Sequence, residues 1–150
     1  MSKTQTFQRP FLLGIEGGGT RTTVLLADTR GREIQRAIFG PGNVRLLDDR
    51  ELRRLLRQIS KQFESPDAIG LGLAGSRQPK DRARVQAEVA KVWKATPCRV
   101  THDLEIALAG FNAKETAVLV LSGTGSCCFG KAAEGRTVKM GGWGHILGDK

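Results

Sequence analysis

The chain has 150 residues and a formal net charge of +9, with 39% apolar and 26% charged residues. This length and composition suit one globular domain or slightly more and exclude a disordered chain. No apolar run is long enough for a membrane-spanning helix, and the polar first ten residues lack the apolar core of a secretion signal. The three cysteines, two of them adjacent, form no disulfide framework, so we expect a cytoplasmic protein.

The positive charge is unevenly distributed. Residues 1–102 carry 19 basic and 10 acidic side chains, whereas residues 103–150 carry five of each. Such an excess can attract nucleic acid, but an arginine-rich, solvated helix face is the favoured interpretation. Because the chain has no RNA-binding aromatic pattern, zinc finger or helix-turn-helix pattern, we expect neither a nucleic-acid nor a membrane partner.

Two short apolar runs open the chain and predict strands at residues 11–15 and 22–27, and residues 33–39 give a weaker signal for a third strand. The first two are joined by a glycine turn at residues 16–21, and the third follows a turn at Arg30-Gly31. Short strands with tight connections favour an antiparallel meander.

Helical periodicity begins after the meander. Apolar residues at helical spacing predict one helix through residues 52–63 and a second through residues 85–93. Asp48 and Glu51 have the spacing of a capping box for the first helix, and Pro79 lies near the start of the second.

Strands and a short helix alternate along the rest of the chain. We expect buried strands at residues 68–73 and 117–121, a short strand at residues 98–101, and a short helix that ends at Ala109. A meander followed by alternating helices and strands predicts an α/β domain with a mixed sheet.

The pattern starts again near residue 115 with a new strand and a new glycine turn. We therefore predict an N-terminal tail at residues 1–10, a first domain at residues 11–115, and the incomplete start of a second, similar domain at residues 116–150.

Two glycine turns follow apolar strands and are candidates for phosphate binding. The turn Gly17-Gly18-Gly19-Thr20 has more glycines than a hairpin needs, and its bare N–H groups suit an anion. Glu16 beside it suits a hydrated Mg²⁺ ion. The turn Gly123-Thr124-Gly125 repeats this arrangement, although a plain structural hairpin remains an alternative for each. Two such turns facing each other would clamp the phosphates of a nucleotide.

Asp103 lies just past a strand end, where a carboxylate acts either as a helix cap or as a general base. His102 beside it is expected to be structural, and His102 and His145 lack the spacing of zinc ligands. Trp143, among glycines, is either a core anchor or the wall of a sugar pocket, with Asp149 placed to bond ring hydroxyls. Cys127 and Cys128 are expected to be small apolar residues of a strand.

These motifs together resemble the N-acetylglucosamine kinase family, among the BadF/BadG/BcrA/BcrD-type ATPases of the actin/hexokinase/Hsp70 superfamily. The resemblance runs from Phe11 to Asp149, and the segment Gly141-Gly-Trp-Gly144 with the following Gly-Asp is its most specific part. It implies a ribonuclease H-like, actin-like ATPase fold. It also implies an ATP- and Mg²⁺-dependent transfer of the γ-phosphate to the 6-hydroxyl of N-acetylglucosamine or a related amino sugar.

The resemblance implies a role for each matching residue. The first turn, Gly17 to Thr20, and the second, Gly123 to Gly125, bind the ATP phosphates, and Asp103 is the catalytic base. The residues implied to contact the sugar are Asn43, Asp103, Ser126, Cys127, Gly142, Trp143, Gly144 and Asp149. Glu16 stands where many superfamily members have Asp, so we expect it to hold Mg²⁺ through water.

The family is about twice as long as this chain and has an adenosine-binding motif that is absent here. We therefore expect the N-terminal portion of a kinase, inactive alone because two domains must close over the substrates. The oligomeric state stays open, with a homodimer as one option at full length. The alternatives are an activator ATPase of 2-hydroxyacyl-CoA dehydratases, a non-catalytic sugar sensor on the same fold, and a basic nucleic-acid-binding module.

Overall fold

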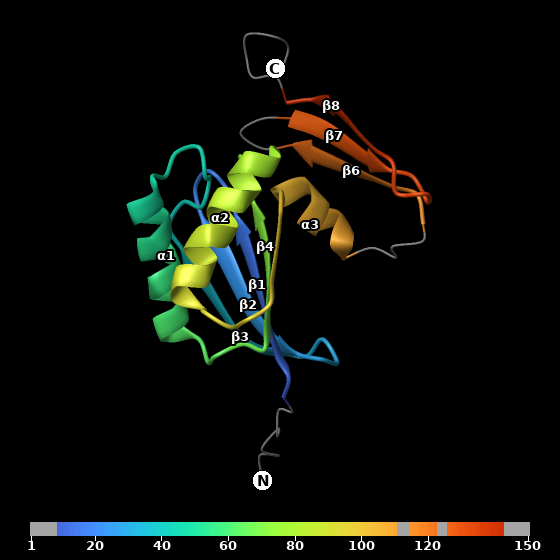
Figure 1. The fold of residues 1–150 in the computed structure, drawn as a ribbon. Coiled ribbons are helices and arrows are strands. Elements are labelled where there is room, and N and C mark those ends of the chain that lie inside the picture. Colours follow the sequence, from blue (N-terminus) through green and yellow to red (C-terminus); the bar gives the residue numbers. More distant parts are fainter. Residues whose placement is uncertain (1–8, 111–114, 123–125, 143–150) are drawn as a thin grey trace. The chain divides into compact units, whose positions relative to one another are not determined.

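The computed structural model describes residues 9–110, 115–122 and 126–142. The chain forms two compact units, residues 1–103 and residues 104–150. Figure 1 colours the first unit from blue to yellow and the second in orange and red. Within the described ranges, no helix is both long and apolar enough to cross a membrane.

The first unit is built on a five-stranded mixed sheet with the strand order β3-β2-β1-β4-β5 (Figure 1). Its strands are β1 (Phe11–Gly17), β2 (Thr22–Asp28), β3 (Glu33–Phe39), β4 (Ala68–Leu73) and β5 (Cys98–Thr101). The first three form the predicted antiparallel meander, whereas β4 runs parallel to β1 and β5 runs parallel to β4. The carboxyl ends of β1, β4 and β5 therefore lie at the same end of the sheet.

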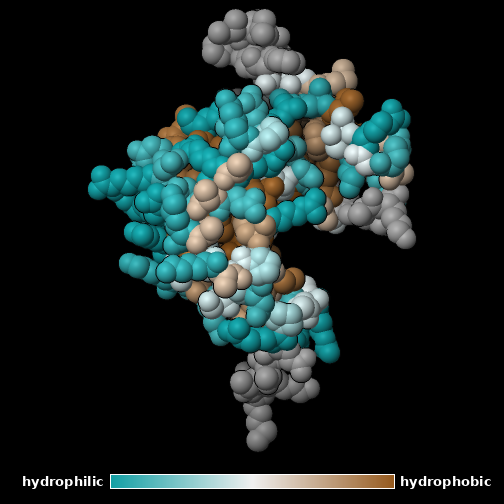
Figure 2. Space-filling model, viewed as in Figure 1, coloured by the Kyte–Doolittle hydropathy of each residue, from teal (hydrophilic) through white to brown (hydrophobic). Residues whose placement is uncertain are grey.

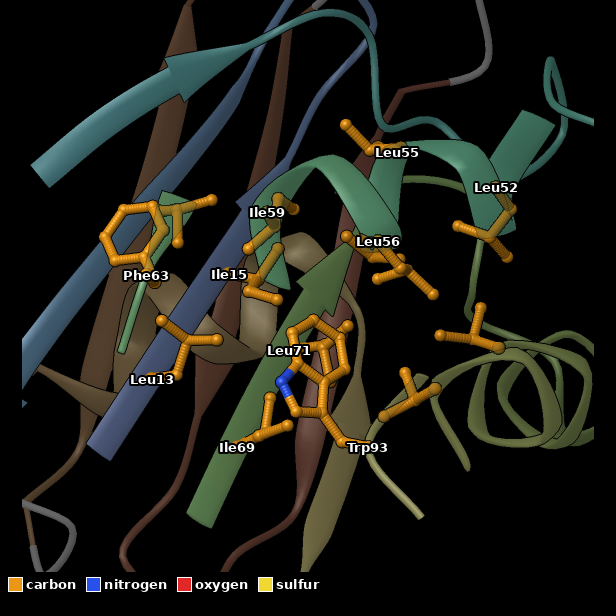
Figure 3. Packing of buried hydrophobic residues seen from close by; sticks show 14 of the residues in the cluster. Leu13, Ile15, Leu52, Leu55, Leu56, Ile59, Phe63, Ile69, Leu71 and Trp93 are labelled. Atoms are coloured by element: carbon orange, nitrogen blue, oxygen red, sulfur yellow. The ribbon is translucent and has the colours of Figure 1, made fainter. Parts of the chain in front are cut away.

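One face of this sheet carries the hydrophobic core, because alternate residues of each strand point to the same side. The register pairs Leu13 with Ile69 and Ile15 with Leu71, and all four side chains are buried (Figure 3). Each such side chain contributes on the order of 1.5–3 kcal/mol when it leaves water. Burial of these apolar side chains is therefore the main interaction that holds the helices on the sheet.

Helices α1 (Asp49–Gln62) and α2 (Pro79–Val92) cover the buried face (Figures 1 and 3). The predicted capping box of α1 is confirmed: Glu51 N donates to Asp48 Oδ1 at 2.7 Å, and Asp48 N donates to Glu51 Oε2 at 2.9 Å. Pro79 occupies the first turn of α2, where its missing N–H leaves no hydrogen bond unmade. The core residues of α1 are Leu52, Leu55, Leu56 and Ile59.

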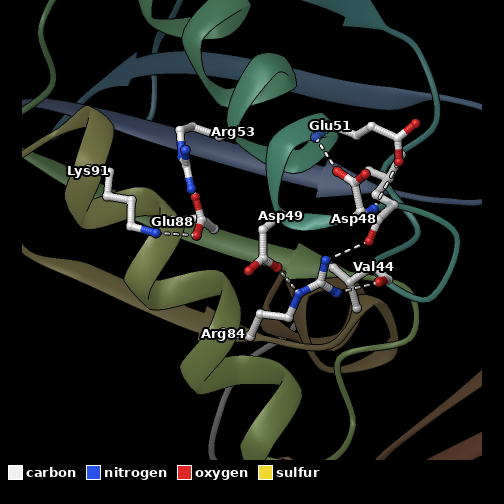
Figure 4. Close-up of polar contacts among 9 residues, drawn as sticks. Val44, Asp48, Asp49, Glu51, Arg53, Arg84, Glu88 and Lys91 are labelled. Atoms are coloured by element: carbon white, nitrogen blue, oxygen red, sulfur yellow. Dashed lines mark hydrogen bonds and ion pairs between the residues drawn. The ribbon is translucent and has the colours of Figure 1, made fainter.

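Glu88 of α2 joins the two helices through a buried carboxylate (Figure 4). Its side chain is 2% exposed and accepts hydrogen bonds from Arg53 Nε at 2.7 Å and Lys91 Nζ at 2.6 Å. The hydrogen bond from Arg53 is the main cause that lowers the Glu88 pKa to about 2. Of the predicted arginine-rich face, Arg53 is thus engaged in a helix–helix contact.

The other cations of that face lie in solvent, over the hydrophilic outer surface of α1 (Figure 2). They make no ion pair within the described part of the chain: Arg50, Arg54, Arg57 and Lys61. This agrees with the solvated, arginine-rich helix face that the sequence analysis favoured.

Arg84 of α2 anchors the loop that leads into α1 (Figure 4). Its guanidinium contacts Asp49 Oδ1 at 2.5 Å and donates to the carbonyls of Val44 and Leu47 at 2.7 and 2.5 Å. One side chain therefore satisfies two carbonyls and one carboxylate. This matters for the site because the same loop carries Asn43.

The second unit contains helix α3 (Asp103–Ala109), which starts at the last residue of the first unit, and a three-stranded antiparallel sheet. Its strands are β6 (Ala117–Ser122), β7 (Ser126–Lys131) and β8 (Thr137–Gly141), in that order. Leu104 and Leu108 of α3 pack with Phe129 of β7 in a small core. Cys127 and Cys128 lie on β7, as predicted.

The prediction of a buried strand at residues 117–121 is wrong in its burial. Val118 and Val120 are 65% and 68% exposed, whereas Leu119 packs against the small core. The strand alternates, so only one of its two apolar faces meets α3. The compact units divide between Asp103 and Leu104, because α3 packs on the second sheet. The assignment of residues 11–115 and 116–150 to two domains stays a prediction.

Candidate active site

The glycine turn between β1 and β2 lies at the carboxyl end of β1. Gly18 N donates to Arg21 O at 2.8 Å and closes the turn. Gly19 has no positive φ and has open space where a Cβ would stand, so neither strain nor packing requires glycine at this position. A residue without a Cβ leaves the turn's N–H groups accessible to an anion, and the neighbouring Thr20 is exposed.

Gly17, by contrast, is required by close packing. A Cβ on Gly17 would lie 2.7 Å from Leu73 Cδ2 and 3.1 Å from the backbone of Gly42. Gly42 N also donates to Gly18 O at 2.9 Å, and Thr22 Oγ1 donates to Gly40 O at 2.8 Å. The loop between β3 and α1 is thereby fixed against the first glycine turn.

Asn43, on this loop, has one half of its carboxamide occupied by the fold. Its Oδ1 accepts a hydrogen bond from Arg45 N at 3.0 Å, which is the Asx-turn geometry that makes Asn common in turns. Gly75 has a φ of +85°, and a Cβ there would lie 2.6 Å from Asn43 Oδ1. Within the described residues the Nδ2 group has no partner, so Asn43 can donate to a ligand.

The turn after β4 ties the ends of three strands together. Ala74 N donates to Gly17 O at 2.7 Å, which fixes the carboxyl end of β4 to that of β1. The hydroxyl of Ser76 is fully buried and lies 2.7 Å from Leu73 O and 2.8 Å from Thr101 O. Ser76 therefore connects β4 to the end of β5, two residues before Asp103.

Asp103 is the first residue of α3, and its carboxylate is about one-third exposed. His102 Nδ1 lies 4.0 Å from Asp103 Oδ1. The pKa of Glu16 is raised above its ordinary value, first by burial and second by the negative charge of Asp103, while Arg21 opposes the shift. Two carboxylates that repel each other in this way suit a shared cation, because a positive charge relieves the repulsion.

The first unit therefore brings together four of the predicted site elements at the carboxyl end of its sheet. These are Glu16, the Gly17–Thr20 turn, Asn43 and Asp103. The carboxyl ends of strands are where ligands bind in open α/β sheets. This arrangement supports a polar ligand at that end of the unit.

The second unit brings three other predicted residues together. Gly142 N donates to Ser126 O at 2.9 Å, and a Cβ on Gly142 would lie 3.3 Å from Cys127 Cβ. The φ of Gly142 is +71°, which favours glycine. The remaining predicted residues lie outside the described ranges: Gly123, Thr124, Gly125, Trp143, Gly144 and Asp149.

Gly75 and Ser76 were not predicted from the sequence to contribute to the site. Ser76 fixes the position of Asp103 through the Thr101 carbonyl, and Gly75 makes room for Asn43. A signal was present, because Ala74-Gly75-Ser76 directly follows a buried strand, as the phosphate turns do.

Residues 13–150 match the model of the BadF/BadG/BcrA/BcrD ATPase family. An N-acetylmuramic acid/N-acetylglucosamine kinase from Clostridium acetobutylicum is 32% identical over 93% of this chain and 48% of its own length. An N-acetyl-D-glucosamine kinase from Dictyostelium discoideum is 26% identical over 94% of this chain and 50% of its own length. The chain thus spans about half the length of these relatives.

A crystal structure from Porphyromonas gingivalis, assigned as an N-acetylglucosamine kinase, superposes with a TM-score of 0.78 at 22% identity. The match covers 93% of this chain and 50% of that one, and it shows a shared fold. The mixed α/β, actin-like ATPase fold predicted from the sequence is confirmed. The match to the family model over residues 13–150 shows that the chain belongs to the BadF/BadG/BcrA/BcrD ATPase family.

Proposed function

We propose that this chain forms part of an ATP-dependent sugar kinase. The kinase transfers the γ-phosphate of ATP to the 6-hydroxyl of N-acetylglucosamine or a related amino sugar. Relatives that align over most of the chain are named as kinases of such sugars. In this proposal residues 11–115 form the first domain, residues 116–150 begin the second, and the complete kinase has both.

In the proposed reaction Asp103 is the general base. Its partly exposed carboxylate lies at the end of β5 and accepts the proton of the sugar hydroxyl as the oxygen attacks phosphorus. Ser76 holds the turn before Asp103, and His102 lies beside it. The hydrogen bond from Ser76 to the Thr101 carbonyl helps to position this carboxylate.

Phosphate binding is assigned to the two glycine turns. The Gly17–Thr20 turn offers N–H groups and the Thr20 hydroxyl, and the turn with Thr124 at its centre is the second element. Mg²⁺ fits the donor set of the first unit, because Glu16 and Asp103 are oxygen donors whose mutual repulsion a cation would relieve. When bound, the ion would neutralise charge on the phosphates, and Glu16 would hold it through water.

The sugar is assigned to Asn43 in the first unit and to residues near Gly142 in the second. Asn43 donates through Nδ2, because its Oδ1 is already bonded to Arg45 N. In the second unit Ser126, Cys127 and Gly142 form one local cluster. Trp143, Gly144 and Asp149, which follow Gly142 in the chain, complete the proposed sugar contacts.

The single observation that carries this function is the linkage of Asn43, the Gly17 turn and Asp103 through Ala74 and Ser76. These contacts support the proposal, because they hold the residues proposed as sugar donor, phosphate turn and base at one end of one sheet. A sugar sensor would also need the sugar contacts, but it would not need the carboxylate at the end of β5.

The test is ADP release by the longest natural reading frame that contains this chain, with ATP and Mg²⁺. The acceptors are N-acetylglucosamine, glucosamine, glucose and no sugar. Release that depends on an amino sugar supports the kinase. Release without sugar would instead support the activator ATPase, and sugar binding without release would support the sensor.

A further inference from the structure

Asn43 and Arg45 extend from one turn and lie over the same glycine. A Cβ on Gly75 would come within 2.6 Å of Asn43 Oδ1 and within 2.8 Å of Arg45 Cγ. Arg45 N donates to Asn43 Oδ1 at 3.0 Å, which fixes the two residues relative to each other. The Asn43 carboxamide and the aliphatic part of the Arg45 side chain therefore lie side by side over Gly75.

The guanidinium of Arg45 retains most of its donor capacity. It contacts Asp81 Oδ2 at 3.3 Å through one nitrogen, and its side chain is 57% exposed. Arginine has five N–H donors in a planar fork, so a single long contact leaves the others available to a second anion. Asp81 orients the group without satisfying it.

A second arginine stands on the neighbouring turn. Arg77 follows Ser76 directly, its side chain is exposed, and it makes no ion pair within the described ranges. Arg82 is engaged differently, because its Nη1 donates to the carbonyls of Ser76 and Arg77 at 3.3 and 2.5 Å. Arg45 and Arg77, which stand on the turns that contain Asn43 and Gly75, thus both retain free donors within the described ranges, and Asp81 is the carboxylate that Arg45 contacts.

We propose that Arg45, assisted by Arg77, forms a carboxylate-binding subsite that makes the enzyme select amino sugars with an acidic substituent. This inference rests on the proposed kinase function. We commit to a carboxylate as the acidic substituent, because its two oxygens match the planar fork of a guanidinium. The planar guanidinium fork matches a carboxylate in two parallel hydrogen bonds, which a neutral hydroxyl cannot reproduce.

The test compares kcat/KM for N-acetylmuramic acid, which carries a lactyl carboxylate, with kcat/KM for N-acetylglucosamine, in the longest natural reading frame that contains this chain. The acidic-to-neutral ratio falls about five- to tenfold in Arg45→Gln, because a charge-assisted hydrogen bond is lost from a partly exposed site. Arg77→Gln lowers the ratio by a smaller factor. The acidic-to-neutral ratio of Arg45→Lys lies between those of Arg45→Gln and the parent, since lysine keeps the positive charge but lacks the planar guanidinium.

Arg57→Gln is the matched control, since Arg57 is an exposed arginine of α1 with no ion pair in the described part of the chain. Arg57→Gln also removes one positive charge, and its acidic-to-neutral kcat/KM ratio is expected to stay within twofold of that of the parent. Thermal melting of each variant reports folding. An unchanged ratio in Arg45→Gln, or an equal loss for both sugars, overturns the subsite while the kinase stands. Failure of the parent to phosphorylate N-acetylmuramic acid, N-acetylglucosamine or glucosamine overturns both proposals.

Discussion

Gly42 packs against Gly17 with no room for a side chain on either residue: a Cβ on Gly42 would lie 2.9 Å from the Cα of Gly17. This contact holds the loop that carries Asn43 against the turn proposed to bind phosphate. The glycines of the first turn therefore serve two different purposes. Gly17 permits close packing of the backbone, whereas Gly19 leaves the turn open.

Alanine at position 42 is expected to lower the free energy of unfolding by about 2 kcal/mol, because the new methyl group meets backbone atoms that cannot turn away. Denaturation in urea measures the change. Gly19→Ala is the matched control, and it is expected to change stability by less than about 0.5 kcal/mol, because its Cβ meets open space. Equal losses in the two variants would show that the close contact is not what requires glycine.

Glu88 makes stability depend on acid pH. Its pKa is about 2 in the folded chain against an ordinary value of 4.5, so the folded state favours the ionised form. The stabilisation is fully present above pH 4.5 and is lost as the pH falls from 4.5 through 2. Glu88→Gln is expected to cost about 2 kcal/mol at pH 7, since removing one partner of a buried charge pair leaves the others uncompensated.

Urea denaturation of parent and Glu88→Gln at several pH values checks this account. The difference between the two narrows as the pH is lowered below 4.5. Glu51→Gln serves as the comparison, because it removes an exposed carboxylate from the capping box of α1. A difference for Glu88→Gln that stays constant between pH 7 and pH 3 would contradict the ionised, paired state.

Glu16 makes stability depend on pH in the opposite direction to Glu88. Its pKa is raised, so the folded chain binds this proton more tightly than the unfolded chain does. Its contribution to stability is therefore present below the ordinary value of 4.5 and is lost as the pH rises through the raised pKa. Glu16→Gln, which cannot ionise, should gain stability relative to the parent between pH 4 and pH 7.

The same measurement in an Asp103→Asn background separates the two causes of the shift. Burial remains in that background, whereas the negative charge of Asp103 is gone. The increase in the free energy of unfolding caused by Glu16→Gln should therefore be smaller in the Asp103→Asn background, but it should not disappear. A gain that is unaffected by the loss of Asp103 would show that the two carboxylates do not interact.

Local sequence patterns were sufficient for the elements of the first unit. The apolar run at residues 22–27 and the capping pair Asp48 and Glu51 predicted a strand and a helix start, and both are confirmed. Such signals depend on neighbours in sequence, through side-chain period and backbone capping. The family resemblance carried by the motifs also implied the ribonuclease H-like, actin-like class.

Burial in the second unit could not be predicted in the same way. Residues 117–121 are apolar at every position, so the sequence does not distinguish a strand covered on both faces from one covered on a single face. Strand β8 was missed because its apolar residues, Val138 and Met140, lie on the exposed face and lack buried partners. The apolar pattern of a strand predicts burial correctly only where another element packs against that strand.

The candidate site was predictable residue by residue but not as an arrangement. Asn43, Asp103 and the glycine turns are recognisable as motifs, but the contacts that join them are distant in sequence. Ser76 reaches Thr101 across 25 residues, and Gly42 meets Gly17 through the packing of two loops. Contacts of this kind depend on the strand order, which no local pattern contains.

The central claim is that Asp103 is the general base of a sugar kinase, and Asp103→Asn tests it most directly, because it keeps the size of the side chain and removes the base. The measurement is kcat for ADP release with N-acetylglucosamine, beside the Kd of the sugar from calorimetry, in the longest natural reading frame that contains this chain. The account predicts that kcat falls about 10²- to 10⁴-fold while the Kd changes less than about threefold. A kcat within tenfold of the parent would contradict the assignment.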